Sequence, residues 1–233
     1  MMKTWWIAER LLWQNRWLFL LLFLWPYAMA AVLLLPHDRP DAADVVSMLH
    51  QECLYGLALV AVNGSAQLGN EQRSRRIIGV LSRAVSRPRY LLALLLASWL
   101  PLALYVVGFV ISGWVLASSV HHSPQGLWQM AGLQLVGGLW LGAISLFFSI
   151  LLQYVLASIA TMLTAAAAVW TALAWSWPGA GRLLVVLPQI GLTGRHTDAH
   201  ELLNVGLTLV FSLAVFAASC WIFERRDLNL TAD

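Results

Sequence analysis

The chain has 233 residues, of which 60% are hydrophobic and 11% are charged, and its mean hydropathy is +0.73. A soluble globular domain carries about a quarter charged residues, so this composition excludes that class and favours a membrane protein. Two cysteines are too few for a disulfide or metal-binding framework, and the net charge of +3 matters less than the positions of the basic residues.

The first predicted element, residues 1–16, is an interfacial helix. Trp6, Trp13 and Trp17 form one stripe at helical spacing, and tryptophan prefers the headgroup level of a membrane. A plain extension of the first span is the alternative. The motif Ala28-Met29-Ala30 is similar to a signal-peptide cleavage site. However, the apolar run continues to Leu35, so we expect this segment to be retained as a membrane span.

Six apolar runs have the length of about 20 residues that a membrane-spanning helix needs. They are Trp17–Leu35, Gln51–Gly69, Tyr90–Ser118, Leu127–Leu151, Val155–Trp177 and Leu202–Phe223. One helix over the fourth and fifth runs would measure about 75 Å, so a turn is predicted near Leu152–Val155. The predicted fold class is therefore an all-α membrane protein, with residues 1–233 forming a single transmembrane domain of six transmembrane helices.

The basic residues divide unevenly between the two predicted membrane faces. With the N-terminus inside, one face receives eleven of them: Lys3, Arg10, Arg16, the six arginines between positions 73 and 89, Arg225 and Arg226. The other face receives three: Arg39, Arg182 and Arg195. The positive-inside rule therefore predicts that both termini are cytoplasmic.

The predicted spans contain few polar side chains. Their interiors lack Asp, Glu, Lys and Arg, and Glu52 lies at the edge of the second span, so no ion-coupling site is predicted. Asn63, Gln67 and Gln134 are candidates for a substrate path, and Asn204 is a further buried amide. Hydrogen bonding between helices is the plainer interpretation of these side chains.

Several chemistries are excluded or disfavoured by the residues present. The single lysine, Lys3, rules out a phosphate-binding loop of the GxxxxGK[ST] type, so energy for transport must come from another polypeptide. No serine, histidine and carboxylate lie at one membrane depth, and we expect neither an enzyme nor a cofactor in this chain. His196 and His200 could share a metal ion on a helix, but without a third ligand solvated loop histidines are favoured, and no metal site is predicted.

The segment Asn70–Leu92 holds six of the thirteen arginines. Read as a helix, Arg73, Arg76, Arg83 and Arg87 fall in one sector beside an apolar sector, and Pro88 ends the helix. The sequence thus predicts an amphipathic cytoplasmic helix over residues 71–88, between spans two and three. Three roles stay open: binding anionic lipid headgroups, docking in a groove of a cytosolic protein, and fixing the topology alone.

The string "LSRAVSRPRYLL" resembles the first cytoplasmic loop of ABC-2 type permeases, the membrane subunits of one class of ATP-driven exporters. Glu71 matches the acidic residue that ends the second span in that family. The matching tripeptides are Leu81-Ser82-Arg83, Val85-Ser86-Arg87 and Tyr90-Leu91-Leu92. The closing "FERRDLNL", Phe223 to Leu230, is similar to the family's cytoplasmic tail. The chain departs from the family pattern at Arg75-Arg76, Ala84 and Ala93-Leu94.

The resemblance implies that residues 71–88 form a coupling helix that fits a cleft on an ATPase subunit. The implied coupling residues are Glu71, Arg73, Arg76, Arg83, Ser86 and Arg87. It also implies a pair of permeases, identical or related, with two ATPase subunits that bind ATP and magnesium, and a short re-entrant segment within the outer-side loop 178–200. Gly138 and Gly142, four residues apart, independently predict a close helix contact.

The expected function is export of a hydrophobic or amphiphilic substrate across a bacterial cytoplasmic membrane, with the lipid bilayer and the ATPase as partners and no role for nucleic acid. Two alternatives stay open. One is a non-transporting membrane scaffold that recruits a cytosolic partner through the basic helix. The other is a lipid-sensing regulator whose basic helix binds headgroups.

Overall fold

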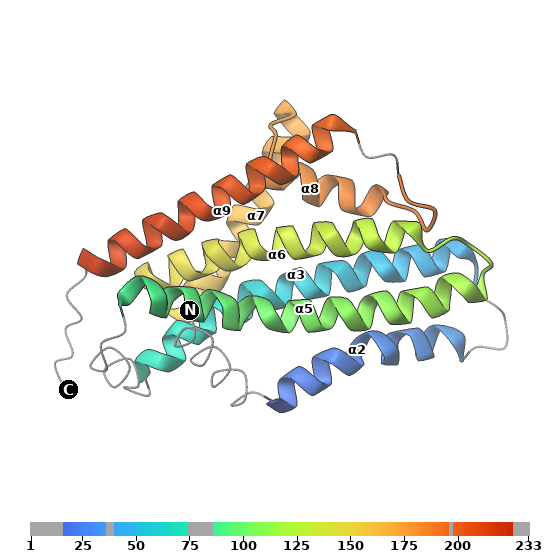
Figure 1. Ribbon diagram of the computed structural model, residues 1–233, viewed down its shortest axis with the longest axis horizontal. Coiled ribbons are helices and arrows are strands. Elements are labelled where there is room, and N and C mark those ends of the chain that lie inside the picture. Colours follow the sequence, from blue (N-terminus) through green and yellow to red (C-terminus); the bar gives the residue numbers. More distant parts are fainter. Residues whose placement is uncertain (1–15, 36–39, 74–85, 196–197, 226–233) are drawn as a thin grey trace.

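The computed structural model of the protein describes residues 16–35, 40–73, 86–195 and 198–225, and every regular element within them is a helix (Figure 1). The elements are α2 (Arg16–Leu34), α3 (Ala42–Arg73), α5 (Arg87–Ser119), α6 (Gln125–Leu151), α7 (Tyr154–Trp175), α8 (Ala180–Val186), the 3₁₀ helix η1 (Leu187–Gln189) and α9 (Ala199–Arg225). The predicted interfacial helix and most of the predicted amphipathic helix lie outside these residues.

Within the described ranges, five helices are long and apolar enough to cross a membrane, which makes the chain an all-helical protein of the multi-pass membrane class. Their span-length parts are Ala42–Leu68, Arg87–Ser119, Gln125–Leu151, Tyr154–Trp175 and Ala199–Arg225. The first predicted span corresponds to α2, whose apolar stretch Leu20–Leu34 is shorter than the other five. Five span-length helices are therefore present among the described residues, and the sixth span stays a prediction.

Helix α3 begins well before the predicted start of the second span. The carbonyl oxygen of Asp41 accepts hydrogen bonds from the amides of Asp44 and Val45, at 3.1 and 3.2 Å, and these bonds open the first turn. The polar residues between Ser47 and Glu52 lower the local hydropathy, and the second span was therefore predicted to begin only at Gln51. These residues do not prevent a helix from forming. Glu52 consequently lies inside the helix and not at its end.

The core of the bundle lies where α3, α5 and α6 pack together, with α2 on the far side of α5 and α7, α8 and α9 beyond α6 (Figure 1). Of the apolar stretch of α6, 67% is buried within the protein, against 17% for α7 and for α9. Helix α6 is therefore the central element. The outer helices α7 and α9 expose long apolar faces of the kind that membrane lipid covers.

Two glycines of α6 allow the close helix contact that the sequence predicts. A side chain at Gly138 would collide with Leu102 of α5. At Gly142 a Cβ atom would lie 3.3 Å from Leu95 of α5 and 3.4 Å from Val60 of α3. The prediction is confirmed: both glycines let the helix backbones approach more closely than larger residues would permit.

The turn predicted near Leu152–Val155 is also confirmed. Helix α6 ends at Leu151 and α7 begins at Tyr154. The two residues between them, Leu152 and Gln153, have extended backbones with ψ of 163° and 153°, which reverse the chain. No glycine or proline is needed, because extended dihedral angles are open to any residue.

The predicted short apolar segment between the last two spans is present as α8 and η1. A side chain at Gly181 would collide with the carbonyl oxygen of Ala168, so α8 lies directly against the backbone of α7. The amide of Gly179 donates a hydrogen bond of 3.0 Å to Asn204 Oδ1, which ties the start of α8 to α9. With seven residues, α8 is too short to cross a bilayer.

Candidate functional site

We call the end of the bundle where α3 ends and α5 begins the basic end. Only some of the predicted coupling residues lie within the described residues. Glu71 and Arg73 belong to the last turn of α3, and Arg76 and Arg83 lie outside the described residues. Ser86 precedes the first turn of α5 with an extended backbone and an exposed side chain.

Arg87 joins the start of α5 to the end of α9. Its Nη1 atom donates hydrogen bonds to the carbonyl oxygens of Phe223 and Glu224, at 3.0 and 2.7 Å. The last carbonyls of a helix have no partner within the helix and form the negative end of its dipole. A guanidinium group at this position therefore satisfies two acceptors and offsets part of that dipole. The sequence marked Arg87 as a coupling residue but gave no sign of this partner.

An apolar cluster beneath Arg87 brings four helices together at the basic end. The rings of Tyr90 on α5 and Phe223 on α9 stack with centroids 6.5 Å apart, and both side chains are fully buried. Leu68 of α3 and Ile150 of α6 complete the contact. The two helices that flank the basic segment are thus packed against the ends of α6 and α9.

The three amides of the predicted substrate path do not form one site. Gln67 Nε2 donates to the carbonyl oxygen of Ala97 at 3.2 Å, and Gln134 Nε2 donates to that of Cys53 at 3.3 Å. These two bonds join neighbouring helices, so both amides serve helix packing, the plainer of the two roles that the sequence left open. Among the described residues, the Oε1 atoms of Gln67 and Gln134 have no hydrogen-bond partner. Asn63 is partly buried on α3, several turns along that helix from Cys53, the residue to which Gln134 is bonded.

Glu52 is a fully buried acidic residue, although the sequence predicts it at the edge of a span. It lies in the interior of α3 with no solvent exposure, so the prediction of spans without ionisable residues is incorrect. Tyr105 of α5 donates its hydroxyl hydrogen bond to Glu52 Oε2 and lies 3.0 Å from the Glu52 carbonyl oxygen. Among the described residues, Glu52 Oε1 has no hydrogen-bond partner.

Aromatic and amide side chains surround this carboxyl group. Trp25 of α2 reaches the carboxyl group, and its ring meets that of Tyr55 edge-on with centroids 6.5 Å apart. One turn along α3, Gly56 leaves room for Gln134 and Tyr105: a side chain there would collide with Gln134 Nε2 and lie 3.0 Å from Tyr105 Cε1. The Glu52 site, defined as Glu52, Tyr105, Gln134 and Trp25, therefore joins α2, α3, α5 and α6.

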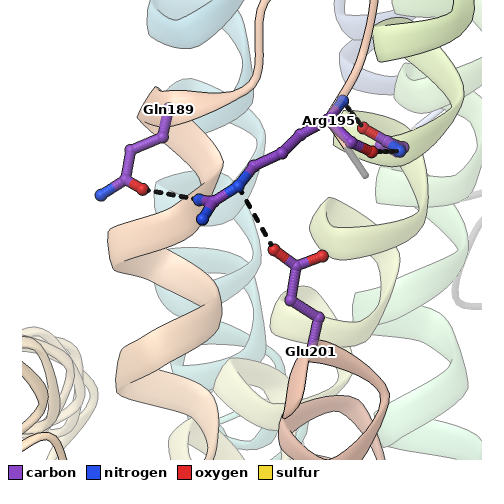
Figure 2. Close-up of polar contacts among 4 residues, drawn as sticks. Gln189, Arg195 and Glu201 are labelled. Carbon is purple, nitrogen blue, oxygen red and sulfur yellow. Dashed lines mark hydrogen bonds and ion pairs between the residues drawn. The ribbon is translucent and has the colours of Figure 1, made fainter. Parts of the chain in front are cut away.

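At the opposite end of the bundle, polar contacts hold the chain that follows η1. His50 Nε2 lies 2.9 Å from the carbonyl oxygen of Ile190, and the amide of Gly126 donates to that of Leu192 at 2.8 Å. Figure 2 shows the Arg195 side chain between Gln189 and Glu201, with a hydrogen bond of 2.8 Å to Gln189 Oε1 and an ion pair of 3.8 Å to Glu201 Oε1. These contacts fix the start of α9.

The two histidines of the metal hypothesis are not both described. His200 is exposed in the first turn of α9, and His196 lies outside the described residues. Glu201, the neighbouring carboxylate, is paired with Arg195. Within the described part of the chain, no group of three or more His, Cys, Asp or Glu side chains could hold a metal ion.

No protein-family model, curated protein or solved structure matches this chain. The class that the fold defines is therefore an all-helical, multi-pass membrane protein, with two polar features: the basic end and the Glu52 site.

Proposed function

We propose that the chain is the permease subunit of an ATP-driven exporter in a bacterial cytoplasmic membrane, with the basic end and both termini in the cytoplasm. One observation carries the proposal: the arginine-rich segment joins α3 to α5 where Arg87 binds the last carbonyls of α9. A partner that moved this segment would act on several helices of the bundle at once. The excess of arginine at this end supports the cytoplasmic orientation.

The proposed mechanism converts ATP hydrolysis in two partner ATPases into helix movement in a pair of permeases. The segment that includes Arg76 and Arg83 contacts the ATPase, where guanidinium groups make paired bonds to carboxylates. Motion passes through Tyr90 and Phe223 to α9, because these rings pack without intervening space. ATP and magnesium are bound by the partner, and the cargo is hydrophobic or amphiphilic.

The proposal is tested by reversing one charge within the arginine segment. Arg83→Glu is expected to abolish the dependence of ATP hydrolysis on transport while the protein still inserts into the membrane. Arg225→Glu is the matched control, since Arg225 lies at the same end but stacks on Trp221 at 4.0 Å, outside the segment. The measurement is ATPase activity and cargo export in vesicles that contain both subunits. Unchanged export by the Arg83 variant contradicts the proposed role.

The scaffold and lipid-sensing alternatives make different predictions for the same segment. A scaffold would retain a cytosolic partner that hydrolyses no ATP. A lipid sensor would bind vesicles only when they contain anionic lipid, and it would need no ATPase partner. Purification of the complex from native membranes, followed by an ATPase assay, separates the three functions.

A further inference from the structure

The Glu52 site contains a buried acidic group without a cationic partner. Among the described residues, no arginine or histidine forms an ion pair with Glu52; the one ion pair there is between Arg195 and Glu201. His50, two residues earlier on α3, is bonded instead to the carbonyl oxygen of Ile190. A lone carboxylate in a membrane-spanning helix is costly, and such residues bind a proton, an ion or a substrate charge.

The neighbouring groups donate hydrogen bonds to the carboxyl group of Glu52 but supply no charge that would neutralise it when ionised. Tyr105 of α5 and Trp25 of α2 reach the Glu52 carboxyl group, and Cys53 is its neighbour on α3. Beyond them, Gln134 of α6 lies near Tyr105, and the ring of Tyr55 meets that of Trp25. None of them carries a positive charge. Tyr105 donates to Oε2, which leaves Oε1, the oxygen without a hydrogen-bond partner among the described residues, to carry the proton of the acid.

Trp25 closes the site on the side of α2. Its ring is 41% exposed and that of Tyr55 is 49% exposed, whereas Glu52 behind them is not exposed at all. Helix α2 is packed closely on α5, where a Cβ atom at Gly108 would lie 2.8 Å from the carbonyl oxygen of Phe23. At the seam between α2 and α3, Trp25 therefore lies against the carboxyl group, with the ring of Tyr55 beside it.

We propose that the Glu52 site binds a single positive charge inside the membrane-spanning bundle: a proton while Trp25 covers it, and a monovalent cationic group once Trp25 moves away. On opening, the O–H bond of Glu52 breaks and its proton passes to water. The carboxylate that remains is neutralised by the entering cation. Gln134 Oε1, which has no hydrogen-bond partner among the described residues, and the ring of Tyr105 supply further contacts for that cation. This proposal does not depend on the export function.

The first test is infrared spectroscopy of the full chain in lipid nanodiscs at neutral pH. The difference between wild type and Glu52→Gln is expected to contain the carbonyl band of a protonated carboxylic acid, shifted in deuterated water. Glu224→Gln is the matched control, because Glu224 is exposed and its difference spectrum is expected to contain carboxylate bands. Carboxylate bands in the difference spectrum between wild type and Glu52→Gln would overturn the proposal, whether or not the variant is less stable.

The second test concerns Trp25 and the exchange of the proton for a cation. Trp25→Ala is expected to lose the acid band at neutral pH, since water then reaches the carboxyl group; retention of the band contradicts closure by Trp25.

Tetraphenylphosphonium or sodium is then added to the Trp25→Ala variant at a lower pH, where the acid band is present. Loss of the band on addition supports exchange, and the effective probe identifies the type of cation. Retention with both probes overturns cation binding. Neither test needs an ATPase, so failure here leaves the proposed export function untouched.

Discussion

At the scale of single residues, the bundle depends on positions where a small side chain lets two helices approach. Gly138 and Gly132 both lie on α6 and have opposite surroundings. A side chain at Gly138 would meet Leu102, whereas nothing lies within 4 Å of the position that a Cβ atom would take at Gly132. Replacing each glycine by alanine therefore separates the effect of packing on stability from the effect of helix propensity.

We expect Gly138→Ala to lower the free energy of unfolding by about 1–3 kcal/mol, because the methyl group has no room beside Leu102. Gly132→Ala is expected to leave it unchanged or raise it by up to about 1 kcal/mol, since alanine is the better helix former. Reversible unfolding in mixed detergent micelles measures both. Equal effects of the two substitutions would show that the contact with Leu102 does not limit packing.

At the scale of elements, the sequence predicted helices more reliably than their ends and partners. The run from Leu127 to Trp177 predicted two helices and a turn, because its length exceeds a bilayer thickness. Both helices were found within a few residues of the predicted bounds. The start of α3 was missed, because hydropathy falls between Ser47 and Glu52 although the helix continues through them.

The segment between η1 and α9 is held by side chains of other helices, and Gln129 of α6 is the clearest example. Its Oε1 atom accepts a hydrogen bond of 2.7 Å from the amide of Arg195, and its Nε2 atom donates to the Arg195 carbonyl oxygen. One amide side chain thus pairs with both backbone groups of one residue. This segment is therefore held to α6 by Gln129, in addition to the hydrogen bond from Gly126 to Leu192.

We expect Gln129→Ala to increase hydrogen exchange at the amide of Arg195 by about fivefold, corresponding to the roughly 1 kcal/mol of a lost hydrogen bond. Gln125→Ala is a suitable control, because Gln125 lies exposed one turn earlier on the same helix. Exchange measured residue by residue in nanodiscs tests this. If the amide of Arg195 exchanges at the same rate in both variants, Gln129 does not restrain the segment between η1 and α9.

At the scale of the whole molecule, the charge distribution and the helix arrangement together define two ends. The loop between α5 and α6, with exposed Ser123, lies at the end opposite to Ser86. The positive-inside rule assigns the arginine-rich end to the cytoplasm. Both native cysteines are at least partly buried, so their replacement leaves a background suitable for labelling single introduced cysteines.

In that background we expect Ser123→Cys to react with a membrane-impermeant maleimide in intact cells. Ser86→Cys is expected to react only after the membrane is permeabilised, because the proposed orientation places the basic end in the cytoplasm. The extent of labelling before and after permeabilisation is read by a mass shift. The reverse pattern would place the arginine segment outside and remove the basis for coupling to an ATPase.

The sequence by itself determined the membrane class of the protein, the five span-length helices of the described residues and the small-residue contact at Gly138 and Gly142, because these depend on local composition and on spacing within one helix. Only the tertiary structure decided that Arg87 binds the end of α9, with partners 136 and 137 positions away in the chain. It likewise decided that Glu52 is buried against Tyr105, 53 positions away. Burial and hydrogen bonding of a side chain depend on which helices pack around it. The hydropathy of one segment does not indicate which other helices these are.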